Sequence, residues 1–157
     1  MIFAKIDFIN LLPFHIYIKK NISSTQTKSI IEYKKSYPSL INKKFKKRKV
    51  DSAFISSIAS RNEKKLDLGI IAKKDVLSVL LIPGNEEKDF QSDTSNALAK
   101  VLDLKGKVLI GDKALKFYHS TKKNDFIDLA KFWNEKYNLP FVFAVLCYSS
   151  HKIQLEK

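Results

Sequence analysis

Short apolar runs, rich in β-branched and aromatic residues, alternate along this chain with segments whose apolar residues have helical spacing. The runs are predicted as strands at Ile2–Phe8, Ser29–Lys34, Val50–Ile55, Leu66–Ala72, Val76–Ile82, Val108–Ile110 and Phe141–Cys147. Helices are predicted to start near Pro13 and Pro38 and to cover Thr94–Leu104, Ala114–Phe117 and Phe126–Tyr137. Such an alternation favours an α/β fold, and helical crossovers between strands predict largely parallel sheets.

The length of 157 residues fits one domain or two small lobes built from one chain. Because 45% of the residues are apolar, the chain can bury a packed core and is not a disordered basic tail. The composition changes at Pro83-Gly84, and the acidic, polar segment Gly84–Ser92 is predicted to connect into a second unit.

The charge is strongly positive, with 29 basic and 16 acidic residues and a net charge of +13. Segment Lys43–Lys49, with six basic residues in seven, is typical of a nucleic-acid or anionic-lipid patch. Three points favour a solvated helix face instead. Only Arg48 and Arg61 offer the planar fork that suits phosphate and guanine edges, and a lysine bias also arises from an AT-rich genome. No zinc-finger, RRM or KH signature accompanies the patch.

The sequence predicts no metal site and no membrane span. Cys147 is the single cysteine, and His15, His119 and His151 lie far apart without metal-ligand spacing. No apolar run approaches the roughly 20 residues of a membrane span. The apolar first segment lacks a basic start and a small-residue cleavage site. We therefore expect a protein of the reducing cytoplasm.

Small polar residues follow several predicted strands. Asn10 follows the first strand, Ser56 and Ser57 follow the third, and Asp112 comes after Ile110. In open α/β sheets ligands bind outside the carboxyl ends of the strands, so these side chains could converge on one crevice. The alternative is that each residue caps the helix that follows it.

Segment Ser92–Asn96 opens a predicted helix, for which Thr94 is a good N-cap. Free backbone N–H groups, the positive end of the helix dipole and several hydroxyls would together suit a carboxylate or a phosphate. An N-cap without any ligand is the alternative reading of the same residues.

Six motifs, in this order and spread over nearly the whole chain, resemble the chorismate dehydratase family of the futalosine route to menaquinone. They are Asp7–Pro13, Val50–Ser57, Ser78–Ile82, Ser92–Ser95, Leu109–Leu115 and Leu139–Val145. The resemblance implies a two-lobed fold like that of the type II periplasmic binding proteins, located in the cytoplasm, with the ligand in a cleft between the lobes.

Under this resemblance, residues 1–82 would form the first lobe together with 148–157, and residues 83–140 would form the second. Segments 76–82 and 141–147 would be the strands that link them. The connections on both sides of the Thr94 helix are short, so we expect a reduced second lobe. The chain also ends at Lys157, soon after the last strand, whereas family members usually continue into C-terminal helices.

The family reaction removes water from chorismate and gives 3-[(1-carboxyvinyl)oxy]benzoate, with no metal or organic cofactor. By motif, Asn10 would be catalytic and Asp112 would lie at the cleft edge, while substrate oxygens would be bound by Ser56, Ser78, Thr94 and Ser95. Forming an aromatic ring supplies the driving force, so the enzyme chiefly orients the substrate and stabilises developing charge. We expect a substrate carboxylate to accept the proton, with Asp112 as the second choice.

Two other functions stay open from the residues alone. A non-catalytic protein of the same fold could hold a small carboxylate in the same cleft, and a basic nucleic-acid-binding module would rest on charge only. Turnover of chorismate separates the first alternative from the enzyme. A steeply salt-dependent affinity for nucleic acid identifies the second.

Overall fold

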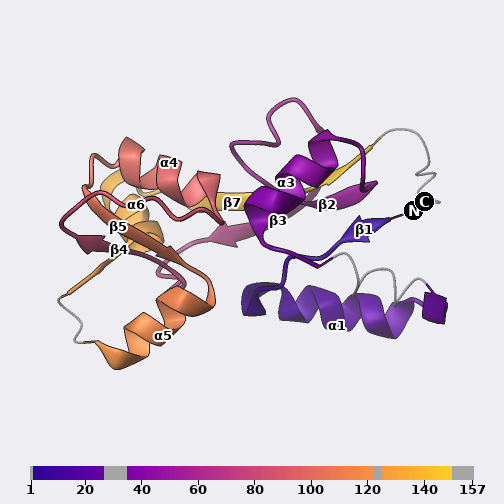
Figure 1. The fold of residues 1–157 in the computed structure, drawn as a ribbon, viewed down its shortest axis with the longest axis horizontal. Coiled ribbons are helices and arrows are strands. Elements are labelled where there is room, and N and C mark those ends of the chain that lie inside the picture. Colours follow the sequence, from indigo (N-terminus) through magenta and orange to yellow (C-terminus); the bar gives the residue numbers. More distant parts are fainter. Residues whose placement is uncertain (1, 27–34, 122–124, 150–157) are drawn as a thin grey trace. The chain divides into compact units, whose positions relative to one another are not determined.

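The computed structural model describes residues 2–26, 35–121 and 125–149, which form a mixed α/β structure with two sheets (Figure 1). The chain divides into two compact units, one of residues 1–69 with 144–157 and one of residues 70–143. Strands β3 (Lys64–Ala72) and β7 (Phe141–Tyr148) contribute residues to both units. The strand predicted at Ser29–Lys34 lies outside the described residues.

The first unit is built on a four-stranded sheet with the order β1-β2-β7-β3. Strand β1 (Phe3–Ala4) runs parallel to β2 (Ser52–Ser56), and β2 runs antiparallel to β7. Every residue of β2 is buried, because β2 is an inner strand. The sheet therefore holds the carboxyl end of β2, and Ser56 with it, inside the first unit.

Helices of the first unit pack against this sheet. A short 3-10 turn, η1 (Ile9–Leu11), leads into α1 (Leu12–Asn21), which has Pro13 in its first turn as predicted. Helix α3 (Pro38–Lys46) follows the predicted Pro38 start and buries Ile41 and Phe45 completely. Lysines occupy its exposed face, so the amphipathic spacing in the sequence is confirmed.

The second unit has a three-stranded sheet with the order β5-β4-β6. Its strands are β4 (Val79–Pro83), β5 (Gly106–Ile110) and the two-residue β6 (Ile127–Asp128). The buried first three residues of β4 confirm the prediction of a strand covered on both faces. Its helices are α4 (Asp93–Val101), α5 (Asp112–Ser120) and α6 (Leu129–Tyr137).

Glycine is required where β5 begins. A Cβ atom added to Gly106 would overlap the carbonyl oxygen of Ile82 on the neighbouring strand. The close approach of the two backbones fixes the register in which Val79 lies opposite Ile110. This register places the start of β4 beside the end of β5.

The prediction of largely parallel sheets is wrong. Strand β1 is parallel to β2, but the β2–β7, β4–β5 and β4–β6 pairs are antiparallel. A helix between two strands does not by itself fix their relative direction. The long connection that carries α4 returns the chain antiparallel to β4.

The first strand is shorter than predicted because its partner changes along the segment. Phe3 and Ala4 pair with β2, whereas Ile6 forms a separate parallel bridge with Ser36. Backbone bonds to Ser36 from both sides of Ile6, at 2.9 and 3.2 Å, hold that bridge. The backbone bonds of the predicted strand are therefore shared between two neighbours.

Candidate functional site

The six residues predicted for the site fall in both units. Asn10 and Ser56 belong to the first unit, whereas the second unit contains Ser78, Thr94, Ser95 and Asp112.

Asn10 is the middle residue of η1 and is exposed. The turn is closed by the Leu11 N–H, which donates to the Phe8 carbonyl at 3.1 Å. Leu11 is 4% exposed and anchors the turn in the core. A buried leucine thus holds a tight turn that presents an amide side chain to solvent.

Ser56 ends β2 and is held by Asn42 of the neighbouring helix α3. The Asn42 Nδ2 donates to Ser56 Oγ at 2.8 Å, and the Ser56 N–H donates to Asn42 Oδ1 at 3.1 Å. Both residues are buried. Because Ser56 Oγ accepts in this pair, its own hydroxyl proton is left to donate to an oxygen of a ligand.

Sequence reasoning missed Asn42, which stands beside a run of lysines. It lies three residues before the buried Phe45, at a spacing that places both on the buried face of α3. A polar residue on the apolar stripe of a helix was the available signal. Such a residue must find a buried partner, and Ser56 is that partner.

Ser78 and Asp112 lie at the same end of the second sheet. The Gly111 N–H donates to the Ser78 carbonyl at 2.8 Å, and Asp112 follows as the first residue of α5. Gly111 precedes α5 with a φ of +60°, a conformation that favours glycine. The structure thus brings together two residues that stand 34 positions apart in the sequence.

The segment that leads into Ser78 is fixed by a carboxylate that the sequence analysis did not single out. The N–H groups of Val76 and Leu77 both donate to Asp128 Oδ2, at 2.8 and 2.7 Å. The other oxygen of Asp128 accepts from the N–H groups of Ala130 and Lys131, both at 3.0 Å, and so caps α6. One buried side chain therefore ties the approach to β4 to the start of α6.

Thr94 was predicted as the N-cap of α4, but the N-cap in the structure is Ser92. Ser92 Oγ accepts from the Ser95 N–H at 3.1 Å, and the two serine hydroxyls are 2.9 Å apart. Thr94 is 4% exposed, and its Oγ1 has no hydrogen-bond partner among the described residues. A buried hydroxyl left in this state costs about 1–3 kcal/mol, which a bound oxygen would recover.

The first turns of α4 and α5 are connected by an ion pair. Lys113 of α5 donates from Nζ to Asp89 Oδ2 at 2.6 Å, and Asp89 lies just before α4. Two helix N-termini, one with Thr94 and the other with Asp112, are therefore joined within one unit. Both present the positive end of a helix dipole, which suits an anion.

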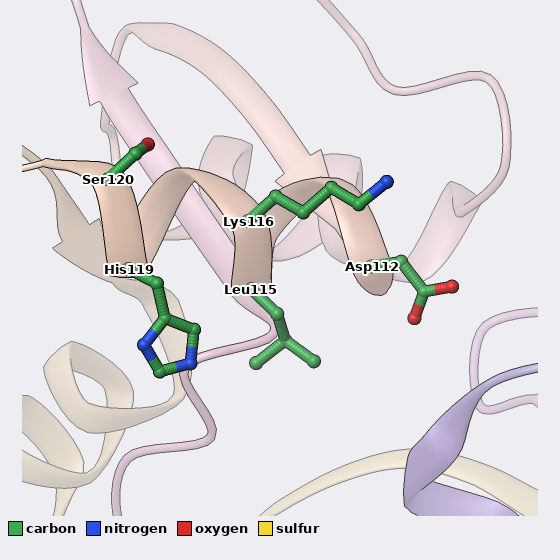
Figure 2. A pocket seen from close by; sticks show the side chains of 5 residues that line it. All are labelled: Asp112, Leu115, Lys116, His119 and Ser120. Carbon is green, nitrogen blue, oxygen red and sulfur yellow. The ribbon is translucent and has the colours of Figure 1, made fainter.

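A pocket of about 460 Å³ lies along α5 and is lined by Asp112, Leu115, Lys116, His119 and Ser120 (Figure 2). Figure 2 shows the Leu115 and His119 side chains projecting to the same side of the helix. The lining residues supply a carboxylate, a lysine amine, an imidazole and a hydroxyl beside the apolar Leu115 side chain. Among the predicted site residues, Asp112 lines this pocket.

The positive charge is concentrated in the first unit. By sequence, 17 basic and 6 acidic residues belong to that unit, a net charge of +11, whereas 12 basic and 10 acidic residues give +2 in the second. The basic segment Lys43–Lys49 is at the C-terminal end of α3, where cations are favourable for the helix dipole. Arg48 also pairs with Glu63 at 3.5 Å and lies over the Phe45 ring. Helix stabilisation thus accounts for part of the basic run.

Cys147 is fully buried in β7, and this burial raises the pKa of its thiol to about 11. The thiol is therefore protonated at neutral pH and unreactive.

Within the described part of the chain, no cluster of three histidine, cysteine or acidic side chains could hold a metal ion. Over the same residues, no helix has both the length and the apolar character to cross a membrane.

Comparison with known proteins gives two matches. Residues 91–156, from just before α4 to beyond β7, match the family described as Menaquinone biosynthesis. A chorismate dehydratase from Campylobacter jejuni subsp. jejuni serotype O:23/36 (strain 81-176) is 55% identical over 147 residues. That alignment covers 92% of this chain and 66% of the relative, so the chain spans just under two thirds of the length of the curated relative.

Proposed function

Because this chain belongs to the chorismate dehydratase family, we propose that it removes water from chorismate and gives 3-[(1-carboxyvinyl)oxy]benzoate for menaquinone biosynthesis. The observation that carries the proposal is the 55% identity to a chorismate dehydratase over 92% of the chain. In this function the protein is a carbon–oxygen lyase, a hydro-lyase, of the cytoplasm.

We further propose the two-lobed architecture of the type II periplasmic binding proteins, with a reduced second lobe and a short C-terminus. The first lobe would comprise residues 1–82 with 148–157, and the second residues 83–140, linked by segments 76–82 and 141–147. The division of the chain into two compact units, one of them discontinuous in sequence, supports this proposal.

Chorismate is a dianion, and the second unit offers groups suited to a carboxylate. The buried hydroxyl of Thr94, without a partner among the described residues, can donate to a carboxylate oxygen at the start of α4. Ser95 and Ser78 would contribute further contacts, with Asp112 at the edge of the site. From the first unit, the Ser56 hydroxyl proton that is not used in the Asn42 pair can donate to another oxygen.

The reaction breaks a ring C–H bond and the C–O bond of the ring hydroxyl, and the ring becomes aromatic as water leaves. The elimination is redox-neutral, so its balance requires no oxidant or reductant. A carboxylate of the substrate accepts the proton, and the exposed amide of Asn10 orients that carboxylate or donates to the departing hydroxyl. Asp112 is the second candidate for the base, although its charge would oppose a dianion unless its side chain is turned away from the substrate carboxylates.

The test is to incubate the full chain with chorismate and follow the aromatic product by absorbance and mass. Replacing Asn10 by alanine should lower kcat by about 10²–10³, the usual effect of removing one donor to developing charge. Asn21→Ala is the matched control, because Asn21 is also an exposed asparagine and its amide donates to the Tyr17 carbonyl of its own helix. No product from the unmodified chain would refute the proposed function. Full turnover by Asn10→Ala would refute the role of Asn10 alone.

A second candidate function is the binding of a small carboxylate without turnover. The helix start with the buried Thr94 hydroxyl favours carboxylate binding whether or not elimination follows. Calorimetric titration with chorismate, followed by mass analysis of the same sample, separates the two functions. Binding with recovery of intact chorismate would identify the binding protein.

A further inference from the structure

Asp89 and Lys113 join the starts of two helices in the second unit. Lys113 is the second residue of α5, and its Nζ lies 2.6 Å from Oδ2 of Asp89. The Asp89 side chain is 1% exposed and that of Lys113 is 45% exposed. The pair therefore joins a buried carboxylate to a lysine whose side chain is still partly exposed to solvent.

Asp89 is in turn firmly attached to α4. Its N–H donates to Asn96 Oδ1 at 2.9 Å, and its carbonyl accepts from Asn96 Nδ2 at 2.8 Å. Its second carboxylate oxygen accepts from the Gln91 N–H at 2.9 Å. Because Asn96 lies in α4, a displacement of Lys113 would be transmitted through Asp89 to the start of that helix.

The stability of either helix does not explain this arrangement. A lysine in the first turn of a helix opposes the positive end of the dipole. A buried carboxylate is costly unless it is paired and hydrogen-bonded. The Asp89 carboxylate suits the start of α4, but Lys113 is unfavourable for the dipole of its own helix α5. The pair therefore specifies the relation between α4 and α5 rather than the formation of α5.

We propose that Lys113 and Asp89 are positioning residues for the chorismate site, an inference that rests on the proposed function. They keep the Thr94 end of α4 and the Asp112 end of α5 at a fixed separation. Lys113 also neutralises the Asp89 carboxylate, which would otherwise place a negative charge near the binding site of a dianion. Neither residue touches the reacting atoms.

Kinetics of the full chain test the charge relation. Lys113→Met should raise the KM for chorismate by about tenfold with a smaller change in kcat, because the buried Asp89 charge is left unpaired. Adding Asp89→Asn should recover much of the loss, and Lys113→Arg should come close to the unmodified KM. Lys107→Met is the matched control. It also removes one positive charge and breaks the exposed Lys107–Glu87 pair at 2.9 Å.

Amide hydrogen exchange supplies a readout that does not depend on chorismate. Lys113→Met should accelerate exchange in residues 92–96 and 111–114 together, and Lys107→Met should leave both segments unchanged. Acceleration confined to residues 111–114, or none, would overturn the inference. So would equal KM values for Lys113→Met and Lys107→Met in a chain that converts chorismate. If the unmodified chain converts none, the proposed function fails, while exchange still decides whether the pair couples the two helices.

Discussion

Removing the Asp128 carboxylate should strongly destabilise the second unit. Asp128→Ala takes away an acceptor for four backbone N–H groups, two at Val76 and Leu77 and two in the first turn of α6. Loss of the helix cap costs about 1 kcal/mol. The two remaining donors lose bonds to a charged group, at about 1–2 kcal/mol each. The expected loss is therefore about 3–5 kcal/mol, a large part of the stability of a small domain.

The assay is urea unfolding followed by fluorescence. The chain has a single tryptophan, Trp133, which lies in α6 and so reports on the second unit. Asp128→Asn should lose about half as much as Asp128→Ala, because an amide still offers one acceptor oxygen. The control is Asp75→Ala, which removes an exposed carboxylate from the same segment and should change stability by less than about 0.5 kcal/mol. A loss below about 1 kcal/mol in Asp128→Ala would refute the reasoning.

Two further predictions concern buried polar atoms. Thr94→Val should raise the free energy of unfolding by about 1 kcal/mol, because it removes a hydroxyl without a partner among the described residues. The same change should raise the KM for chorismate by about 10–100-fold. A loss of stability in a urea melt would contradict the first effect, and an unchanged KM would contradict the second. For Cys147, the folded pKa of about 11 lies above the unfolded value of 9.0, so its stabilising effect is complete below pH 9 and disappears as the pH rises through about 11. Stability measured between pH 8 and 11 should therefore fall about 2 kcal/mol further in the unmodified chain than in Cys147→Ala, and parallel curves would disprove the assignment.

Local patterns in the sequence predicted those elements whose burial follows a simple period. The apolar run around β4 and the stripe containing Ile41 and Phe45 in α3 are examples, since a strand or helix must bury such residues wherever it packs. Strand direction was not predictable in this way. Whether β5 runs with or against β4 depends on how the chain returns through α4, which hydrophobic spacing does not encode.

The polar partners in the site region were missed for a related reason. Asn42 lies 14 residues from Ser56, and Asp89 lies 24 from Lys113. Asp128 lies 52 and 51 residues from Val76 and Leu77, whose N–H groups donate to it. Such pairs are made by tertiary packing, and neither member is unusual alone. The order of the family motifs nevertheless nominated Ser78 and Asp112, which the β4–β5 register brings to one end of a sheet.

The discontinuous first unit has a consequence for the order in which the chain folds during synthesis. Its inner strand β2 pairs on one side with residues 144–148 of β7. These residues leave the ribosome only after the whole second unit. Residues 70–143 form the second unit without interruption, so that unit can fold while the first still exposes the β2 edge. The nascent chain can thus complete its second unit before its first. During this interval its unpaired β2 edge is the segment that a chaperone would have to protect from aggregation.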